Sequence, residues 1–102
     1  MKKLEDMTLP SGRRLVFAYG RHIFQCHLIS SKSRRIFDIG EGCSRADALA
    51  ALTQQAIQRM MRYYGRHHTY WYSIAYELRQ VLKQAKAGIP KPSKSDVWGV
   101  VR

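Results

Sequence analysis

The sequence predicts a single α+β domain, ordered βββαα, in which a three-stranded antiparallel meander is followed by two helices packed on one sheet face. Two observations predict it. Short β-rich or alternating segments, separated by turn residues, fill the first part of the chain, and two longer segments with apolar residues at helical spacing follow them. A chain of 102 residues with 45% hydrophobic content is also large enough for one core.

The strands are expected to be short and joined by tight turns. Gly20, then a polar stretch around Ser30, and finally Gly40 and Gly42 separate or end them, which favours hairpins over crossovers. We expect the three strands at residues 15–19, 23–29 and 35–39. In the second of these, Phe24, Cys26 and Leu28 should share one face.

Two helices are expected after the strands. The first begins at Ser44, whose hydroxyl can cap the amide of Asp47, and Gly65 interrupts its pattern. The second is expected over residues 68–87, because Gly88 and Pro90 stop it. The residues predicted to be buried on the two helices are Leu49, Leu52, Ala56, Met60, Tyr63, Trp71, Ile74, Leu78, Leu82 and Ala85.

The two ends of the chain are expected to lie outside this domain. Residues 1–12 carry mixed charges and a Pro-Ser-Gly turn, which predicts an N-terminal tail, and residues 13–88 form the α+β domain. Residues 89–102 are expected to be a linker with an apolar C-terminal tip. We expect the tip to fold back as an added strand or to dock on a partner or second subunit, which would make a homodimer.

The charge of the chain points to a polyanionic partner. Eighteen Lys and Arg face seven Asp and Glu, a net charge of +11, and no acid lies between Asp47 and Glu77. In that interval basic and aromatic residues alternate, a pattern suited to phosphate contacts and base stacking. The predicted nucleic-acid-binding residues are Arg13, Arg14, Arg21, Lys32, Arg34, Arg35, Arg62, Arg66, Tyr72, Arg79 and Lys83. DNA and RNA are both open as targets.

The strand-side cations have two interpretations. Helices that cover one sheet face leave the other in water, so these cations could converge on the open face or its edges and contact a nucleic acid. Alternatively, Lys32, Arg34 and Arg35 keep a turn soluble and protect a sheet edge from pairing.

The junction between the last predicted strand and the first helix resembles the double-stranded RNA-binding domains. That family carries a Gly-x-Gly-x-Ser sequence before a helix, which Gly40, Gly42 and Ser44 match, followed by lysines that hold phosphates. Arg45 falls in that basic cluster here, while Ala46 and Leu49 stand at lysine positions. The resemblance implies binding to RNA phosphates near the start of the helix.

Residues 11–61 are also similar to the arm-binding domains of phage integrases. The shared features are a Gly12-Arg13-Arg14 strand start, two further strands, and a helix that opens with Ser44-Arg-Ala-Asp-Ala. This resemblance implies a three-strand-plus-helix module that binds DNA.

We predict that the protein is not an enzyme and holds no metal or cofactor. Its acids are scattered, and it has neither a Gly-rich phosphate loop nor a nucleophile elbow. His67 and His68 are adjacent and would point ~100° apart on a helix, while Cys26 and His27 face opposite sides of a strand. Glu77 is expected to pair loosely with Arg79 or Lys83.

The chain is expected to be cytoplasmic and to have no membrane partner. No apolar run approaches the ~20 residues that span a bilayer, and the start lacks the apolar segment of a secretory signal. Two cysteines do not make a disulfide framework, so we expect a buried Cys26 thiol and a Cys43 thiol in the loop before the helix.

A second class of function fits the same composition. Exposed Tyr and Arg are also the residues that dominate protein interfaces. The alternative is therefore a small accessory or inhibitor protein, encoded by a phage or mobile element, that binds an acidic surface of a larger protein. A continuous basic stripe would favour nucleic acid, and a compact aromatic patch rimmed by charge would favour protein.

Overall fold

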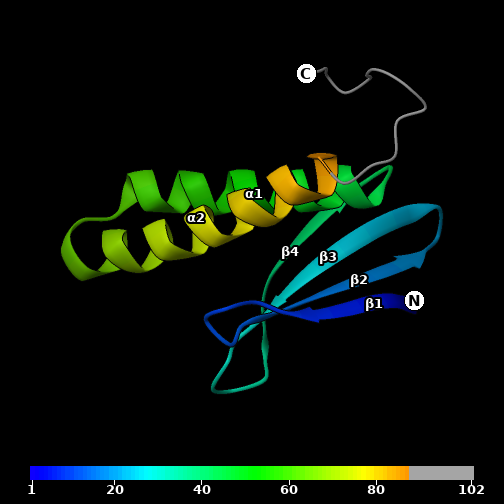
Figure 1. The fold of residues 1–102 in the computed structure, drawn as a ribbon, viewed down its shortest axis with the longest axis horizontal. Coiled ribbons are helices and arrows are strands. Elements are labelled where there is room, and N and C mark those ends of the chain that lie inside the picture. Colours follow the sequence, from blue (N-terminus) through cyan, green and yellow to red (C-terminus); the bar gives the residue numbers. More distant parts are fainter. Residues whose placement is uncertain (88–102) are drawn as a thin grey trace.

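The computed structural model describes residues 1–87, and the side chains of residues 1–84. Four strands form one antiparallel sheet in chain order, and two helices then pack as a hairpin on one of its faces (Figure 1). The predicted α+β class, the meander and the two helices on one face are confirmed. The predicted C-terminal tip lies outside the described residues. The elements are β1 (Lys2–Thr8), β2 (Arg14–Gly20), β3 (Ile23–Ile29), β4 (Ile36–Gly42), α1 (Arg45–Arg62) and α2 (Gly65–Ala87).

The sheet has one strand more than the sequence predicted. The expectation of three strands and a tail over residues 1–12 is wrong, because Lys2–Thr8 forms β1 and pairs with β2 along the edge of the sheet. Its sequence, KKLEDMT, is mostly exposed and has no apolar alternation. The segment is a strand because its backbone pairs with β2, and its charges and the bulge between Lys3 and Glu5 suit an exposed edge.

The core lies between the sheet and the two helices. Leu15, Phe17, Cys26 and Leu28 alternate along β2 and β3 toward the helices, as the pattern predicted for β3. The helical faces are also as predicted, except that Tyr63 is 40% exposed, and the Ala85 side chain lies outside the described part. The helix residues buried in this core are Ala48, Leu49, Leu52, Ala56, Trp71, Ile74, Ala75 and Leu78, with Met60 and Leu82 packed against it.

Helix α1 lies directly on β4 because two residues of that strand have no side chain. A Cβ atom on Gly40 would lie 2.3 Å from the carbonyl oxygen of Ala48 and 2.5 Å from the amide nitrogen of Leu52. A Cβ atom on Gly42 would meet the Cβ of Asp47 at 2.5 Å. The helix begins here as predicted, since the Ser44 hydroxyl accepts a hydrogen bond from the Asp47 amide at 3.0 Å.

A two-residue connection joins the helices, and α2 begins at Gly65, three residues earlier than predicted. Gly65 adopts a φ of 59°, so it supplies a left-handed turn into the helix rather than a break after it. His68 Nδ1 lies 2.8 Å from the carbonyl oxygen of Met60 and must donate to it, which ties the start of α2 to the end of α1. Neither described helix is long and apolar enough to cross a membrane.

The close approach of α1 to β4 predicts that Gly40→Ala is destabilising. The added methyl group would meet backbone atoms that cannot rotate away, so we expect a loss of at least about 2 kcal/mol in the free energy of unfolding. Urea unfolding measures the loss. Leu52→Ala should cost roughly 2–5 kcal/mol as a core truncation, and exposed Gln58→Ala should stay within about 0.5 kcal/mol. A Gly40→Ala protein as stable as the Gln58→Ala control would contradict the packing.

The two thiols should differ in reactivity. Burial raises the pKa of Cys26 to about 12, whereas Cys43 is exposed in the loop before α1. The thiolate is the reactive form, so Cys26 should be inert in the folded protein. Alkylation at pH 8 should modify one thiol per chain in native buffer and two in urea. Equal labelling rates for both thiols in the native protein would show that Cys26 is accessible.

Candidate nucleic-acid interface

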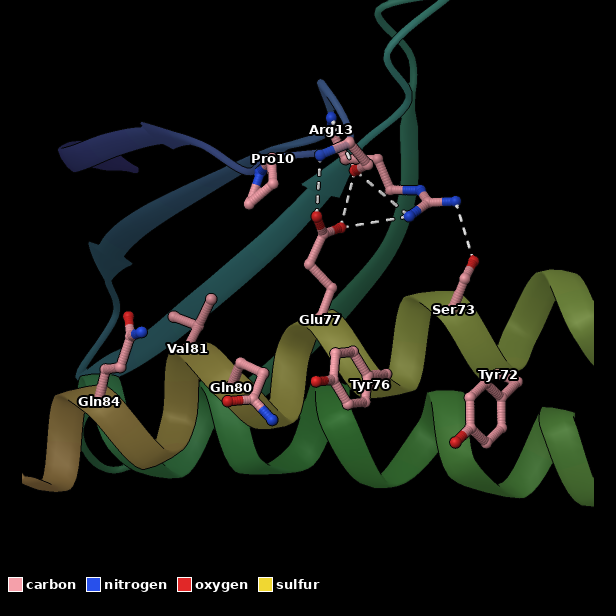
Figure 2. Close-up of a pocket in the computed structure, with 10 residues that line it drawn as sticks. Pro10, Arg13, Tyr72, Ser73, Tyr76, Glu77, Gln80, Val81 and Gln84 are labelled. Carbon is pink, nitrogen blue, oxygen red and sulfur yellow. Dashed lines mark hydrogen bonds and ion pairs between the residues drawn. The ribbon is translucent and has the colours of Figure 1, made fainter.

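Helix α2 has one side turned to the strands and one side turned to water. Ser73, Glu77 and Val81 point toward β1 and β2 and the turn between them, while Tyr72 and Tyr76 stand one helical turn apart on the outer side (Figure 2). The two tyrosines are 54% and 57% exposed. Residues at i and i+4 share a face of a helix, and Arg79 and Lys83 continue the same face. The exposed residues His68, Tyr72, Tyr76, Arg79 and Lys83 are called the α2 stripe below.

A groove runs along each side of the two tyrosines. One groove, of about 490 Å³, lies between α2 and the turn after β1, where Pro10 forms part of the wall. The other, of about 510 Å³, is lined by Arg79, Leu82 and Lys83. Tyr72, Tyr76 and Gln80 line both grooves, so the rings form a ridge with space on either side.

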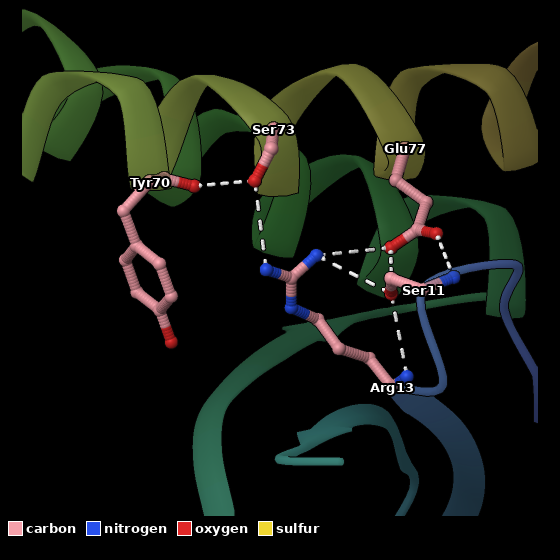
Figure 3. A network of polar contacts seen from close by, with 5 residues as sticks. All are labelled: Ser11, Arg13, Tyr70, Ser73 and Glu77. Atoms are coloured by element: carbon pink, nitrogen blue, oxygen red, sulfur yellow. Dashed lines mark hydrogen bonds and ion pairs between the residues drawn. The ribbon is translucent and has the colours of Figure 1, made fainter. Parts of the chain in front are cut away.

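The inner side of α2 is held to the β1–β2 turn by a polar network, here called the clasp, of Ser11, Arg13, Ser73 and Glu77 (Figure 3). The Glu77 carboxylate accepts hydrogen bonds from the Ser11 amide at 3.0 Å, the Ser11 hydroxyl at 2.7 Å and the Arg13 guanidinium at 3.2 Å. Arg13 also reaches the Ser73 hydroxyl at 3.5 Å. The Arg13 and Glu77 side chains are only 15% and 13% exposed, so this ion pair is largely shielded from water.

The clasp gives Arg13 and Glu77 different partners from those that the sequence predicted. Arg13 was predicted to contact nucleic acid, but its charge is matched by Glu77 and its guanidinium lies 5.6 Å from the ring of Tyr70. Glu77 was expected to pair with Arg79 or Lys83, and that expectation is wrong. Because Glu77 faces Arg13, the only acid in the sequence of α2 is turned away from the α2 stripe.

Most other acids of the described chain are also matched by a nearby cation. Asp6 pairs with Arg14 and, at 3.6 Å, with Lys3. The hydrogen bond from Arg14 holds the pKa of Asp6 below its usual range. Glu5 pairs with Arg45 at 2.5 Å and Asp38 with Arg59 at 3.5 Å. Within residues 1–84, the cations with no carboxylate inside 4.0 Å are Lys2, Arg21, Lys32, Arg34, Arg35, Arg62, Arg66, Arg79 and Lys83.

The open face of the sheet does not gather the strand-side cations. Arg14 lies on it, paired with Asp6, beside a polar row in which Gln25 donates to Glu41 at 2.6 Å and lies 2.8 Å from His27. Partial burial lowers the pKa of His27 from its ordinary value. This face is therefore a mixed surface, with both acids and bases close together.

The remaining strand-side cations sit at opposite ends of the sheet. Arg21 lies in the β2–β3 turn, and Lys32, Arg34 and Arg35 lie in the β3–β4 loop. The seven-residue strand β3 separates the two sites, a span of about 20 Å. The structure thus brings Lys32, Arg34 and Arg35 together but leaves Arg21 apart from them.

Arg62 and Arg66 lie at the end of the helix hairpin, which reaches past the sheet (Figure 1). Every residue from 61 to 70 is exposed. Tyr64 is 89% exposed and Met61 73%, and the Tyr63 and His67 rings lie 5.7 Å apart. Residues 61–67, called the hairpin end below, thus carry exposed aromatic rings and two arginines.

Two residues of the α2 stripe were absent from the predicted set. Tyr76 and His68 lie at i+4 and i−4 from Tyr72, so helical spacing alone could have added both. The His68 and Tyr72 rings have centroids 6.3 Å apart and are tilted by 35°. Among the described residues, no group of three His, Cys, Asp or Glu side chains could hold a metal ion with His68.

Comparison with protein-family models, curated proteins and solved structures finds no match to this chain. The Gly40 and Gly42 positions have a packing role against α1, and Arg45 pairs with Glu5. Packing and ion pairing are thus sufficient physical reasons for these three residues.

The shielded clasp should contribute more to stability than an exposed pair. We expect Arg13→Ala and Glu77→Ala each to cost about 1–3 kcal/mol, and their double-mutant cycle to give a coupling of about 1 kcal/mol or more, because each deletion leaves a polar partner unmatched. The half-exposed Arg45–Glu5 pair is the control, with an expected coupling below about 0.5 kcal/mol. Urea unfolding measures both cycles. Equal couplings would mean that the clasp is not shielded in solution.

Proposed function

We propose that this protein is a non-catalytic nucleic-acid-binding protein that holds phosphates along the α2 stripe. One observation carries the proposal. Arg79 and Lys83 follow two exposed tyrosine rings on a face of α2 from which the helix's only acid is turned away and bound by Arg13. A face of this kind combines unmatched positive charge with flat apolar surface, which is what phosphates and bases require.

The overall charge supports the same class of partner. A net charge of +11 attracts a polyanion over a distance, and each phosphate that a cation neutralises releases a counterion. Four acids of the described chain, Glu77, Asp6, Glu5 and Asp38, are held in local pairs with Arg13, Arg14, Arg45 and Arg59. The resemblance of residues 11–61 to the arm-binding domains of phage integrases also implies a nucleic-acid partner, and both DNA and RNA offer the phosphates.

A second candidate function rests on the hairpin end. Its exposed Met61, Tyr63 and Tyr64 offer apolar and aromatic surface, and Arg62 and Arg66 lie in the same segment. Buried Tyr and Arg anchors dominate the energy of many protein interfaces. This patch favours binding to an acidic surface of a larger protein, as an accessory or inhibitor protein would do. The two candidates use different residues, so mutations separate them.

Charge reversal on the α2 stripe tests the nucleic-acid proposal. The double variant Arg79→Glu, Lys83→Glu should weaken binding to labelled oligonucleotides at least tenfold. It should also lower the slope of log affinity against log salt by about 1.5, because each phosphate contact contributes about 0.7 on single strands and 0.9 on duplex DNA. Fluorescence anisotropy from low to moderate salt measures both quantities.

The matched control is Arg34→Glu, Arg35→Glu in the β3–β4 loop, which changes the net charge by the same amount. We expect it to weaken binding by less than about threefold, since long-range attraction alone is reduced. Equal losses of affinity in the two double variants would show that the interface is not on the α2 stripe. Failure of the unmodified protein to bind any single-stranded or duplex DNA or RNA at micromolar concentration would end the proposal.

A further inference from the structure

We infer that the α2 stripe binds single-stranded nucleic acid, with bases stacked on Tyr72 and Tyr76 and phosphates held by Arg79 and Lys83. The inference rests on the proposed function and names its substrate class. It depends on two features of the described residues: exposed rings beside open grooves, and an order of side chains that suits a nucleic-acid strand running along the helix.

The two tyrosine rings are not used by the fold. Tyr72 has a distant ring contact with His68, at 6.3 Å between centroids, and Tyr76 has no ring contact among the described residues. Tyr70, two residues before Tyr72, behaves differently. Tyr70 is 43% exposed, but its ring packs edge-on against Phe37 and Trp71, so part of it is used by the fold. An exposed tyrosine pair with open grooves on both sides is free to receive flat ligands.

A duplex does not offer the faces of its bases to these rings. Paired bases stack on one another and present only their edges in a groove. Stacking on a side chain therefore requires the unpaired bases of a single strand.

The order of side chains along the α2 stripe suits a single nucleic-acid strand that runs parallel to the helix axis. Tyr72 and Tyr76 are separated by about 6 Å along the axis, and the stripe from Tyr72 to Lys83 is about 16 Å long. When bases stack on the two rings, the phosphates of the strand would lie beside the ridge. Arg79 and Lys83 line the second groove there and could contact them. Gln80 lines both grooves and offers an amide that can hydrogen-bond to base edges.

Ring removal with the charge kept tests the inference. Fluorescence anisotropy with a twelve-residue thymidine strand should show about tenfold weaker binding for Tyr72→Ala and for Tyr76→Ala, with the salt slope unchanged, because stacking carries no charge. Tyr72→Phe and Tyr76→Phe keep the ring and should bind within about twofold of the unmodified protein. Tyr64→Ala at the hairpin end is the matched control and should bind normally. The mutated side chains are exposed, and circular dichroism checks that each variant folds.

Two further ligands separate this inference from the proposed function. An abasic strand with the same number of phosphates should bind the unmodified protein more weakly than the thymidine strand binds either alanine variant, because it loses both stacking contacts. A duplex of equal length should bind more weakly than the single strand at the same salt concentration. Stronger duplex binding, or alanine variants that bind thymidine normally, would overturn the single-strand inference. If Arg79→Glu, Lys83→Glu still abolished duplex binding in that case, the proposed function would stand.

Discussion

Helix α1 lies on strand β4 so closely that Gly40 has no room for a Cβ atom between the strand and the helix backbone. The contact places the start of α1 against the sheet, and the Ser44 cap fixes where the helix begins. The apolar residues of α1 then face β3 and β4, and α2 packs against α1 in turn. The position of α1 on the sheet, and through it that of α2, thus depends on two residues of β4 that have no side chain.

The clasp and the buried residues of α2 both favour the same rotation of this helix about its own axis. Core packing of Trp71, Ile74 and Leu78 turns one face of the helix inward, and Glu77 adds a charged contact beside that face. Both therefore direct Tyr72, Tyr76, Arg79 and Lys83 outward. The network thereby has a consequence for function, because it removes the one negative charge of α2 from the surface that the proposal assigns to phosphates.

The arrangement of charges separates a structural set of cations from a free set. Arg13, Arg14, Arg45 and Arg59 each meet a carboxylate, and Arg59 also lies 4.9 Å from the ring of Trp71. The free set occupies the α2 stripe, the hairpin end, the sheet loops and, with Lys2, the start of β1. A high net charge alone does not distinguish these places. The α2 stripe combines its cations with two exposed tyrosine rings and with the open grooves that these rings line.

The sequence by itself determined the features that depend on local order. Helical spacing predicted the buried faces of α1 and α2, Ser44 predicted the cap, and alternation predicted the inward residues of β3, since periods of 3.6 and 2 are properties of neighbouring residues. Only the tertiary structure decided the rest. Strand β1 exists because β2 offers an edge, and Glu77 meets Ser11 across 66 positions of sequence. Such pairings depend on which segments the fold brings together, and no local pattern in β1 or around Glu77 records them.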